Sequence, residues 1–174
     1  MIHPTPAYIG LGANLGDRQG HLDEAVSLIG SIPGVSLRQC SGTFLTEPQG
    51  LKDQPWFANR VLKISCSPGI SSQSLLDYLQ QIETRMGRVR SIPDGPRIID
   101  LDLLLFGSEV STSQTLTIPH PRMRKRAFVL VPLLEISPDL VLPDGQTVND
   151  ALKQIRYTRV EERIWQDDPG RIQP

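Results

Sequence analysis

The segment Gly95–Gly107, with the sequence GPRIIDLDLLLFG, is the most informative stretch of the 174-residue chain. Its largely apolar run Ile98–Phe106 ends at a glycine, which is typical of a buried strand. Because side chains alternate along a strand, Asp100 and Asp102 share one face, while the residues between them face the other way. Two adjacent carboxylates repel each other unless a cation lies nearby. The segment therefore predicts a strand that presents two acids to divalent metal, and carboxylate oxygens suit Mg²⁺.

Outward from this strand, the spacing of apolar residues predicts alternating strands and helices. The expected strands cover residues 7–12, 35–45, 57–66, 98–106 and 114–118, and the expected helices cover 17–31, 71–86, part of 121–138, and 147–155. The order of the first six elements is that of the ferredoxin-like split βαβ motif. We therefore predict an α+β fold: a ferredoxin-like βαββαβ core with an antiparallel sheet, helices on one side, and an extra C-terminal helical segment.

The domain organisation follows from the length of the chain and from the absence of an internal linker. We expect a single domain over residues 1–155. Residues 156–174 are polar and carry no repeat, so we expect them to form a dispensable surface extension.

Composition excludes several classes of protein. Hydrophobic residues make up 39% of the chain and charged residues 21%, which excludes a disordered chain. The net charge of −1 argues against binding to nucleic acid or to a membrane surface. The two cysteines form no CxxC motif, so neither a disulfide framework nor a structural zinc site is expected. We see neither a signal peptide nor a membrane span, and we expect a cytoplasmic monomer.

Basic residues gather in two clusters that suit a compact anionic ligand. One comprises Arg85, Arg88, Arg90 and Arg97, and the other comprises Arg122, Arg124, Lys125 and Arg126. Arginine binds phosphate oxygens in a bidentate manner, and acids that hold metal beside such arginines are typical of phosphoryl transfer. We assign Arg97 to the site because it closely precedes the acids, and Arg85 to the surface. The basic residues at 122, 124 and 125 could equally form a solvated face.

Other common nucleotide-binding and catalytic motifs are absent. The chain has no Walker A motif, no kinase glycine loop with HRD and DFG signatures, and no GxSxG. The glycines within Gly10–Gly16 lack the parallel βαβ context and the acidic residue of a dinucleotide-binding fold.

The segment Gly95–Gly107 closely resembles the signature of the 6-hydroxymethyl-7,8-dihydropterin pyrophosphokinases, a family of folate biosynthesis. Other stretches are similar to the same family, in order and at compatible spacing: Tyr8–Asp17, Thr46–Pro48 with Phe57–Asn59, Gly87–Arg90, and Pro119–His120 with Arg126–Phe128. The resemblance covers residues 7–155. Pro93 and Asp94 depart from it, since members commonly carry a basic residue and often a tryptophan there.

The resemblance implies transfer of pyrophosphate from ATP to the hydroxymethyl oxygen of a reduced pterin, with release of AMP. It implies that Asp100 and Asp102 hold two Mg²⁺ ions that bridge the ATP phosphates, and that Arg88 and Arg97 are catalytic. It assigns to ATP the residues Gln80, Glu83, Arg90, Arg97, Leu103, Thr117, His120 and Arg126, and to the pterin Thr46, Pro48, Phe57, Asn59 and Phe128.

The chemistry of the pterin residues agrees with that assignment. A flat heterocycle is suited to aromatic faces, and its amide-like edge to an asparagine that both donates and accepts hydrogen bonds. Phe57 and Asn59 have the same strand parity and therefore face one site. Without the resemblance, Phe57 and Phe128 would be assigned to the core. No general base is evident, so we expect catalysis by positioning and charge stabilisation.

Two other functions fit parts of the sequence. A metal-dependent phosphodiesterase or nuclease could use the same acids, although such enzymes usually need a third acidic ligand. A non-catalytic ferredoxin-like module that binds RNA or nucleotide would want exposed aromatics and a basic face on its central strands, whereas Ile98–Phe106 carries acids. A pyrophosphokinase that binds without turnover is disfavoured by the intact acids and Arg97.

Overall fold

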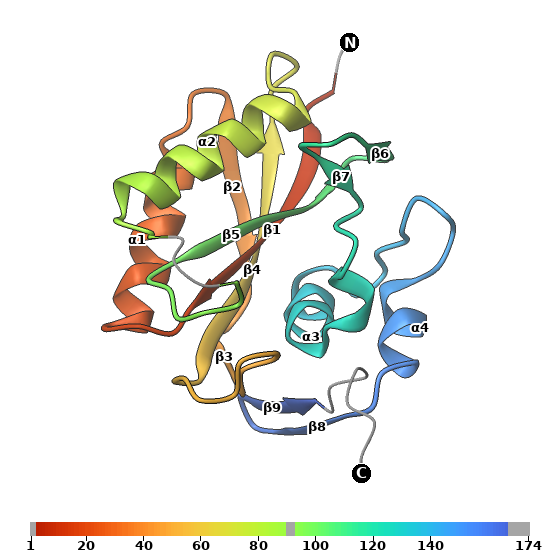
Figure 1. Ribbon diagram of the computed structural model, residues 1–174. Coiled ribbons are helices and arrows are strands. Elements are labelled where there is room, and N and C mark those ends of the chain that lie inside the picture. The colour runs from red at the N-terminus through yellow and green to blue at the C-terminus, as the bar shows by residue number, and fades with distance from the viewer. Residues whose placement is uncertain (1–2, 90–92, 167–174) are drawn as a thin grey trace.

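The computed structural model describes residues 3–89 and 93–166. Its main sheet contains β1 Thr5–Ala13, β2 Val35–Cys40, β3 Phe44–Thr46, β4 Phe57–Cys66, β5 Asp100–Phe106, β8 Tyr157–Val160 and β9 Arg163–Gln166. The strands follow the order β5-β1-β4-β3-β9-β8, and β2 also pairs with β4. Helices cover both faces of this sheet (Figure 1).

Strand β1 lies between β4 and β5 and is antiparallel to both. With β2 and β3 taken as one interrupted strand beyond β4, the four-strand order is that of a ferredoxin-like core. The predicted α+β class and antiparallel core are therefore confirmed. The pairing of β1 with β5 sets Gly12 opposite Asp100 and Gly10 opposite Asp102.

The strand expected over residues 35–45 is broken into β2 and β3. At the break, Ser41 pairs with Val61 of β4 through both its backbone and its hydroxyl: its N–H donates to the Val61 carbonyl, and its Oγ accepts from the Val61 N–H. Glycine follows at position 42, where the chain leaves the ladder and its N–H donates to the Glu135 carboxylate. A side-chain hydrogen bond thus replaces one backbone hydrogen bond between the two strands. The alternation of residue types in the sequence does not predict this replacement.

Two helices, α1 Arg18–Gly30 and α2 Ser72–Arg85, pack against one face of the sheet. Asp17 caps α1, and Ser71 forms a capping box with Ser74 at the start of α2. The apolar stripes of both helices are buried among β-strand residues: Leu22, Ala25 and Ile29 of α1, and Leu75, Leu79 and Ile82 of α2.

The C-terminal helical segment covers the opposite face. It comprises the 3-10 turn η1 Met123–Lys125, α3 Ala127–Ile136 and α4 Val148–Lys153. Its core includes Tyr8 and Val61, whose side chains point away from α1 and α2, and the Tyr8 hydroxyl is hydrogen-bonded to Ser137 at 3.0 Å. The strand expected at 114–118 is only β7 Thr117–Ile118, which pairs with β6 Ser111–Thr112 outside the main sheet.

The expectation of a surface extension after residue 155 is corrected for residues 157–166. Strands β8 and β9 form a hairpin, and β9 joins the main sheet by running parallel to β3. Ile164 is 1% exposed and Gln166 5% exposed. The segment is too short and polar to show its burial in its own sequence, because the partner strand lies more than a hundred residues earlier. Residues 167–174 lie outside the described residues.

Within the described part of the chain, no helix combines the length and apolar character needed to cross a membrane.

The two thiols are predicted to differ in reactivity. Burial raises the pKa of both thiols, that of Cys66 to about 11, but Cys66 is fully buried whereas Cys40 is exposed to reagents. The thiolate is the reactive form of a cysteine. At pH 8, a disulfide reagent should therefore modify Cys40 of the native protein, and should modify Cys66 only after denaturant is added. The Cys40→Ser variant should show no native reaction, and two rapidly reacting thiols would contradict the fold.

Candidate active site

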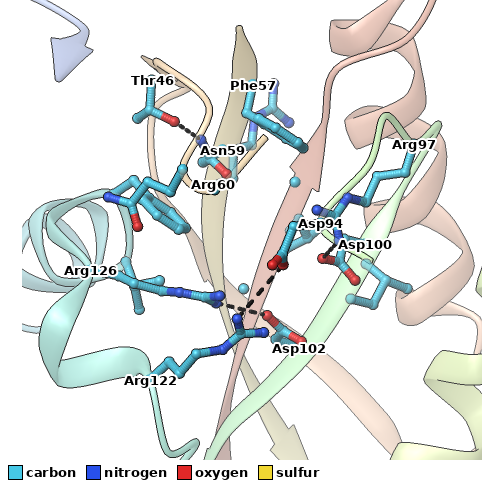
Figure 2. Close-up of a pocket in the computed structure, with 18 of the residues that line it drawn as sticks. Thr46, Phe57, Asn59, Arg60, Asp94, Arg97, Asp100, Asp102, Arg122 and Arg126 are labelled. Carbon is cyan, nitrogen blue, oxygen red and sulfur yellow. Dashed lines mark hydrogen bonds and ion pairs between the residues drawn. The ribbon is translucent and has the colours of Figure 1, made fainter. Parts of the chain in front are cut away.

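A pocket of about 530 Å³ opens where β1, β4 and β5 meet the start of α3 and the loop before β5. Its lining includes eleven of the predicted site residues: Thr46, Phe57, Asn59, Gln80, Glu83, Arg88, Arg97, Asp100, Asp102, Arg126 and Phe128. Figure 2 shows Thr46, Phe57 and Asn59 on one side of the cavity, with the acids and Arg126 on the other. The fold thus brings together segments that are widely separated in the sequence.

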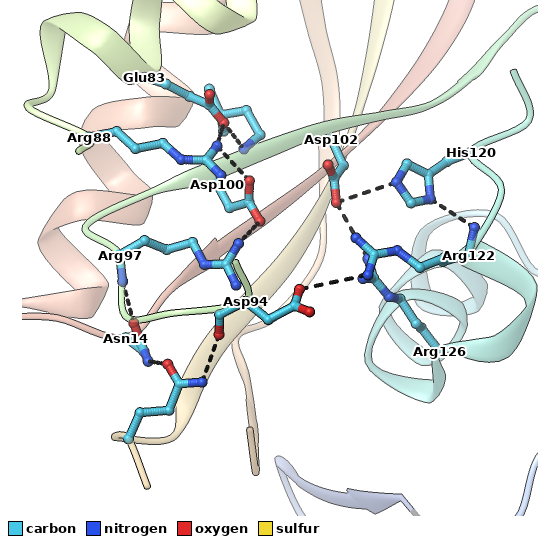
Figure 3. Close-up of polar contacts among 12 residues, drawn as sticks. Asn14, Glu83, Arg88, Asp94, Arg97, Asp100, Asp102, His120, Arg122 and Arg126 are labelled. Carbon is cyan, nitrogen blue, oxygen red and sulfur yellow. Dashed lines mark hydrogen bonds and ion pairs between the residues drawn. The ribbon is translucent and has the colours of Figure 1, made fainter. Parts of the chain in front are cut away.

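The acids Asp100 and Asp102 lie among basic side chains, most of them from other segments (Figure 3). Asp100 forms ion pairs with Arg88 at 2.6 Å and Arg97 at 2.8 Å. Asp102 lies 3.6 Å from Arg126 and 3.8 Å from Nε2 of His120. Among the described residues, no group of three or more His, Cys, Asp or Glu side chains forms a metal site by itself. Any metal bound here would therefore need some of its ligands from a substrate.

The electrostatics of this cluster are set mainly by burial. Burial raises the pKa of Asp102, and the neighbouring Asp100 charge raises it further, against the opposing effect of His120 and Arg126. Burial likewise lowers the pKa of His120 and that of Arg126. An Asp102 carboxylate in this position would gain from a further cation.

Arg97 is prepared for an anionic ligand. Its Nη1 donates to Asp100, its guanidinium lies 5.2 Å from the Phe57 ring centroid, and its buried Nε has no hydrogen-bond partner among the residues described. An unsatisfied buried donor is costly, and a phosphate oxygen would satisfy it.

Glu83 has a supporting position. It is 3% exposed, accepts from the Leu101 N–H at 2.7 Å, and is paired with Arg88. It therefore fixes Arg88 and the start of β5 to α2. Gln80, one turn earlier on α2, lines the pocket.

The side chain of Asn59 is fixed by Thr46, since its Nδ2 donates to the Thr46 hydroxyl at 2.8 Å (Figure 2). Both residues are buried. Gly12 leaves space beside this amide, because a Cβ there would lie 3.1 Å from Asn59 Oδ1. The Asn59 carbonyl is thereby held beside the cavity in one orientation. The resemblance assigned Thr46 to the pterin, and in the structure its side chain orients Asn59.

Five of the implied residues do not line the cavity or cannot be placed. His120 lies just behind it, against Asp102, and Pro48 is buried between two lining residues, Glu47 and Gln49. Leu103 is buried in the core beneath α1 and α2, and Thr117 lies on β7. The prediction for Arg90 falls outside the described residues.

Comparisons with known proteins agree with this geometry. A sequence model of the 7,8-dihydro-6-hydroxymethylpterin-pyrophosphokinase (HPPK) family matches residues 8–138. A 2-amino-4-hydroxy-6-hydroxymethyldihydropteridine pyrophosphokinase of Haemophilus influenzae is 43% identical over 85% of this chain and 91% of its own. The corresponding protein of Bacillus subtilis is 44% identical over 94% of this chain and 92% of its own.

The chain belongs to the HPPK family. The predicted enzyme class, an ATP-dependent pyrophosphokinase of folate biosynthesis, is thereby confirmed. Among solved structures, an HPPK-DHPS in complex with substrates aligns with a TM-score of 0.68 at 11% identity, covering 94% of this chain and 48% of that one. A Plasmodium falciparum HPPK-DHPS with pteroate aligns with a TM-score of 0.66 at 14% identity, and this chain spans about half its length. These two similarities support the fold.

Several residues that line the pocket were not predicted from the sequence. Arg122 and Lys125 line the pocket, whereas Arg124 pairs with Asp144 outside it. The only signal in the sequence for these three residues is their membership of one basic cluster, and this does not distinguish those that line the pocket from the one that does not. Asp94 also lines the pocket: it has a φ of 53°, and its carboxylate lies 3.7 Å from Arg122. Nothing in the sequence marked it except its departure from the family pattern.

Asn14 joins the two loops that flank the HPPK pocket (Figure 3). Its Oδ1 accepts from the Arg97 N–H at 2.7 Å, and its Nδ2 donates to Gln54 and to the Pro55 carbonyl, each at 3.0 Å. The side chain is 2% exposed. It therefore fixes the position of Arg97 relative to the segment before β4.

We expect Asn14→Ala to lower the free energy of unfolding by about 2 kcal/mol, because it leaves the Arg97 N–H and the Pro55 carbonyl without these partners. Urea denaturation measures the change. Asn149→Ala, at an exposed position of α4, is the control and should change stability by less than about 0.5 kcal/mol. Equal effects of the two substitutions would contradict the role of Asn14.

Proposed function

We propose that this pocket transfers pyrophosphate from ATP to the hydroxymethyl oxygen of 6-hydroxymethyl-7,8-dihydropterin, with the residue roles given below. The observation that carries the assignment is the placement of Asp100 and Asp102 among Arg88, Arg97 and Arg126, in the same cavity as Asn59. Acids and arginines in this arrangement serve phosphoryl transfer, and the buried amide serves recognition of a heterocycle.

Asp100 and Asp102 are the residues that would hold Mg²⁺, and two ions are proposed. The donor set fits, because Mg²⁺ usually takes one or two carboxylates together with substrate phosphates. The raised pKa of Asp102 agrees, since it reflects a carboxylate that a cation would stabilise. Bound Mg²⁺ would neutralise the phosphate oxygens and orient the polyphosphate chain. Asp100 would then exchange its arginine partners for metal, and Arg88 and Arg97 would bind phosphate.

The reaction balances without a further reagent. A bond forms between the pterin hydroxymethyl oxygen and the β-phosphorus of ATP, and the bond from that phosphorus to the oxygen of the α-phosphate breaks. AMP leaves with the bonding electrons, and the hydroxyl proton passes to solvent. The chain's part is to orient the two substrates and to stabilise negative charge, through Arg88, Arg97 and Arg126.

The pterin lies between Phe57 and Phe128, with Asn59 at its edge. Both phenylalanines line the cavity, and each has an arginine over its ring: Arg97 at 5.2 Å and Arg126 at 5.4 Å from the respective centroid. Each aromatic wall is thus joined to a residue of the phosphate site. This arrangement sets the hydroxymethyl group of the pterin beside the polyphosphate. ATP approaches from the side of Gln80 on α2, and we propose that the chain acts as a monomer.

A product assay tests the reaction. Protein incubated with ATP, Mg²⁺ and the pterin should form AMP and pterin pyrophosphate in equal amounts. Asp100→Asn and Asp102→Asn should each reduce the rate about a hundredfold or more, because each removes a charge from the proposed metal site. Asp139→Asn, an exposed acid, is the matched control and should keep full activity. Formation of ADP, or AMP formation that does not need the pterin, would contradict the proposal and favour single phosphoryl transfer or hydrolysis.

The pterin site is tested by Asn59→Leu. The variant should raise KM for the pterin about tenfold or more, because it removes the polar partner of the ring edge, and should leave KM for ATP within about twofold. Thr46→Val is a graded comparison, since it removes only the hydroxyl that orients Asn59, and it should have the smaller effect. Steady-state kinetics with each substrate varied in turn supply both constants. A rise in KM for ATP without a rise in KM for the pterin would contradict the assignment of Asn59 to the pterin.

A further inference from the structure

We propose that strand β9 is a positioning element for the pterin half of the pocket, with Gln166 as its decisive positioning residue. The identity of the ligand in this inference rests on the proposed function. None of the described residues of β8 and β9 lines the cavity. Their effect therefore acts through the residues that they hold.

Gln166 fixes the segment that carries one wall of the pocket. Its Oε1 accepts from the Ala127 N–H at 2.7 Å, and its Nε2 donates to the Lys125 carbonyl at 2.6 Å. Gln166 is 5% exposed; its hydrogen bond to Ala127 is buried and that to Lys125 is partly buried. Arg126 lies between the two bonded groups, and Phe128 follows directly. A single buried amide thus spans the backbone from which both of these pocket residues project.

The start of α3 needs such a partner. The first N–H groups of a helix have no partner within the helix, and the N-cap residue here, Arg126, forms no side-chain cap. Arg126 instead turns its side chain toward Asp102. Gln166 supplies the cap from another part of the sheet, which frees Arg126 for the pocket.

The same strand holds the opposite wall. In the parallel pairing of β9 with β3, Ile164 lies opposite Thr46, the residue that orients Asn59. Trp165 points to the other side of β9, where its ring packs edge-on against Trp56, with centroids 5.5 Å apart and an interplanar angle of 83°. Trp56 directly precedes Phe57.

Strand β9 therefore connects both aromatic walls and fixes the distance between them. Figure 1 shows β9 beside β3 and at the opposite end of the molecule from most of α2, which carries Gln80 of the proposed nucleotide side. A loss of Gln166 should therefore widen or loosen the pterin half, and should affect the nucleotide half only through Arg126, one of the three arginines of the proposed phosphate site.

The test compares Gln166→Met with Ile164→Val. Methionine has a similar length and removes both hydrogen bonds, whereas Ile164→Val trims a buried methyl group of the same strand and leaves every hydrogen bond in place. We expect Gln166→Met to raise KM for the pterin about fivefold, because ordering the loosened Phe128 segment on binding then costs affinity. KM for ATP should rise by a smaller factor, because Arg126 is only one of the three arginines of the proposed phosphate site. Ile164→Val should change neither KM, even if it lowers the melting temperature as much as Gln166→Met does.

A second measurement needs no substrate and separates this inference from the proposed function. Amide hydrogen exchange should become about tenfold faster at Ala127 in Gln166→Met and remain unchanged in Ile164→Val. Equal pterin constants for the two variants, or unchanged exchange at Ala127, would overturn the positioning role. If the wild-type chain forms no AMP, the proposed function fails instead. In that case, the quenching of Trp56 and Trp165 fluorescence by the pterin gives the dissociation constant of the pterin for each variant. Equal dissociation constants for Gln166→Met and Ile164→Val would again overturn the inference.

Discussion

Two like charges on one face of a strand are the constraint around which this molecule is organised. Asp100 and Asp102 are adjacent on the pocket side of β5, and their repulsion and partial burial would destabilise the fold if nothing opposed them. The chain opposes them with basic groups from four separate segments: Arg88 after α2, Arg97 before β5, His120 before η1, and Arg126 at the start of α3. The same groups that stabilise the ligand-free chain are those suited to an incoming polyphosphate. In the proposed complex, the acids would therefore pair with metal and the arginines with phosphate, in place of the pairs that they form with each other.

Small residues on the neighbouring strand make room for this arrangement. Gly10 and Gly12 of β1 pair with Asp102 and Asp100, and both glycines line the pocket. At Gly12 an added Cβ would press on the amide of Asn59. The glycine pattern, which superficially resembles a dinucleotide-binding loop, instead leaves open the floor of a cavity over an antiparallel sheet.

The parts of the structure that follow from local periodicity were predictable. The strand Phe57–Cys66 matched its expected bounds, and the shared face of Asp100 and Asp102 followed from alternation alone. Contacts that join distant segments were not predictable in this way. Asp94 and Gln166 stand in no motif, and Asn14 was given no role although it lies within Tyr8–Asp17. Their contacts depend on partners that lie between 28 and 83 residues away. The resemblance assigned Leu103 to the nucleotide, and its side chain lies in the core, so that assignment stays a prediction.

The parallel contact between β3 and β9 also affects when the pocket can form during synthesis of the chain. β3 leaves the ribosome early, yet its neighbour in the sheet is among the last described segments to be synthesised. The ferredoxin-like core can assemble on the nascent chain long before then. On the proposed role of β9, the walls of the pocket acquire their final spacing only after residue 166 has emerged, so a prematurely terminated chain would hold an unfinished pocket.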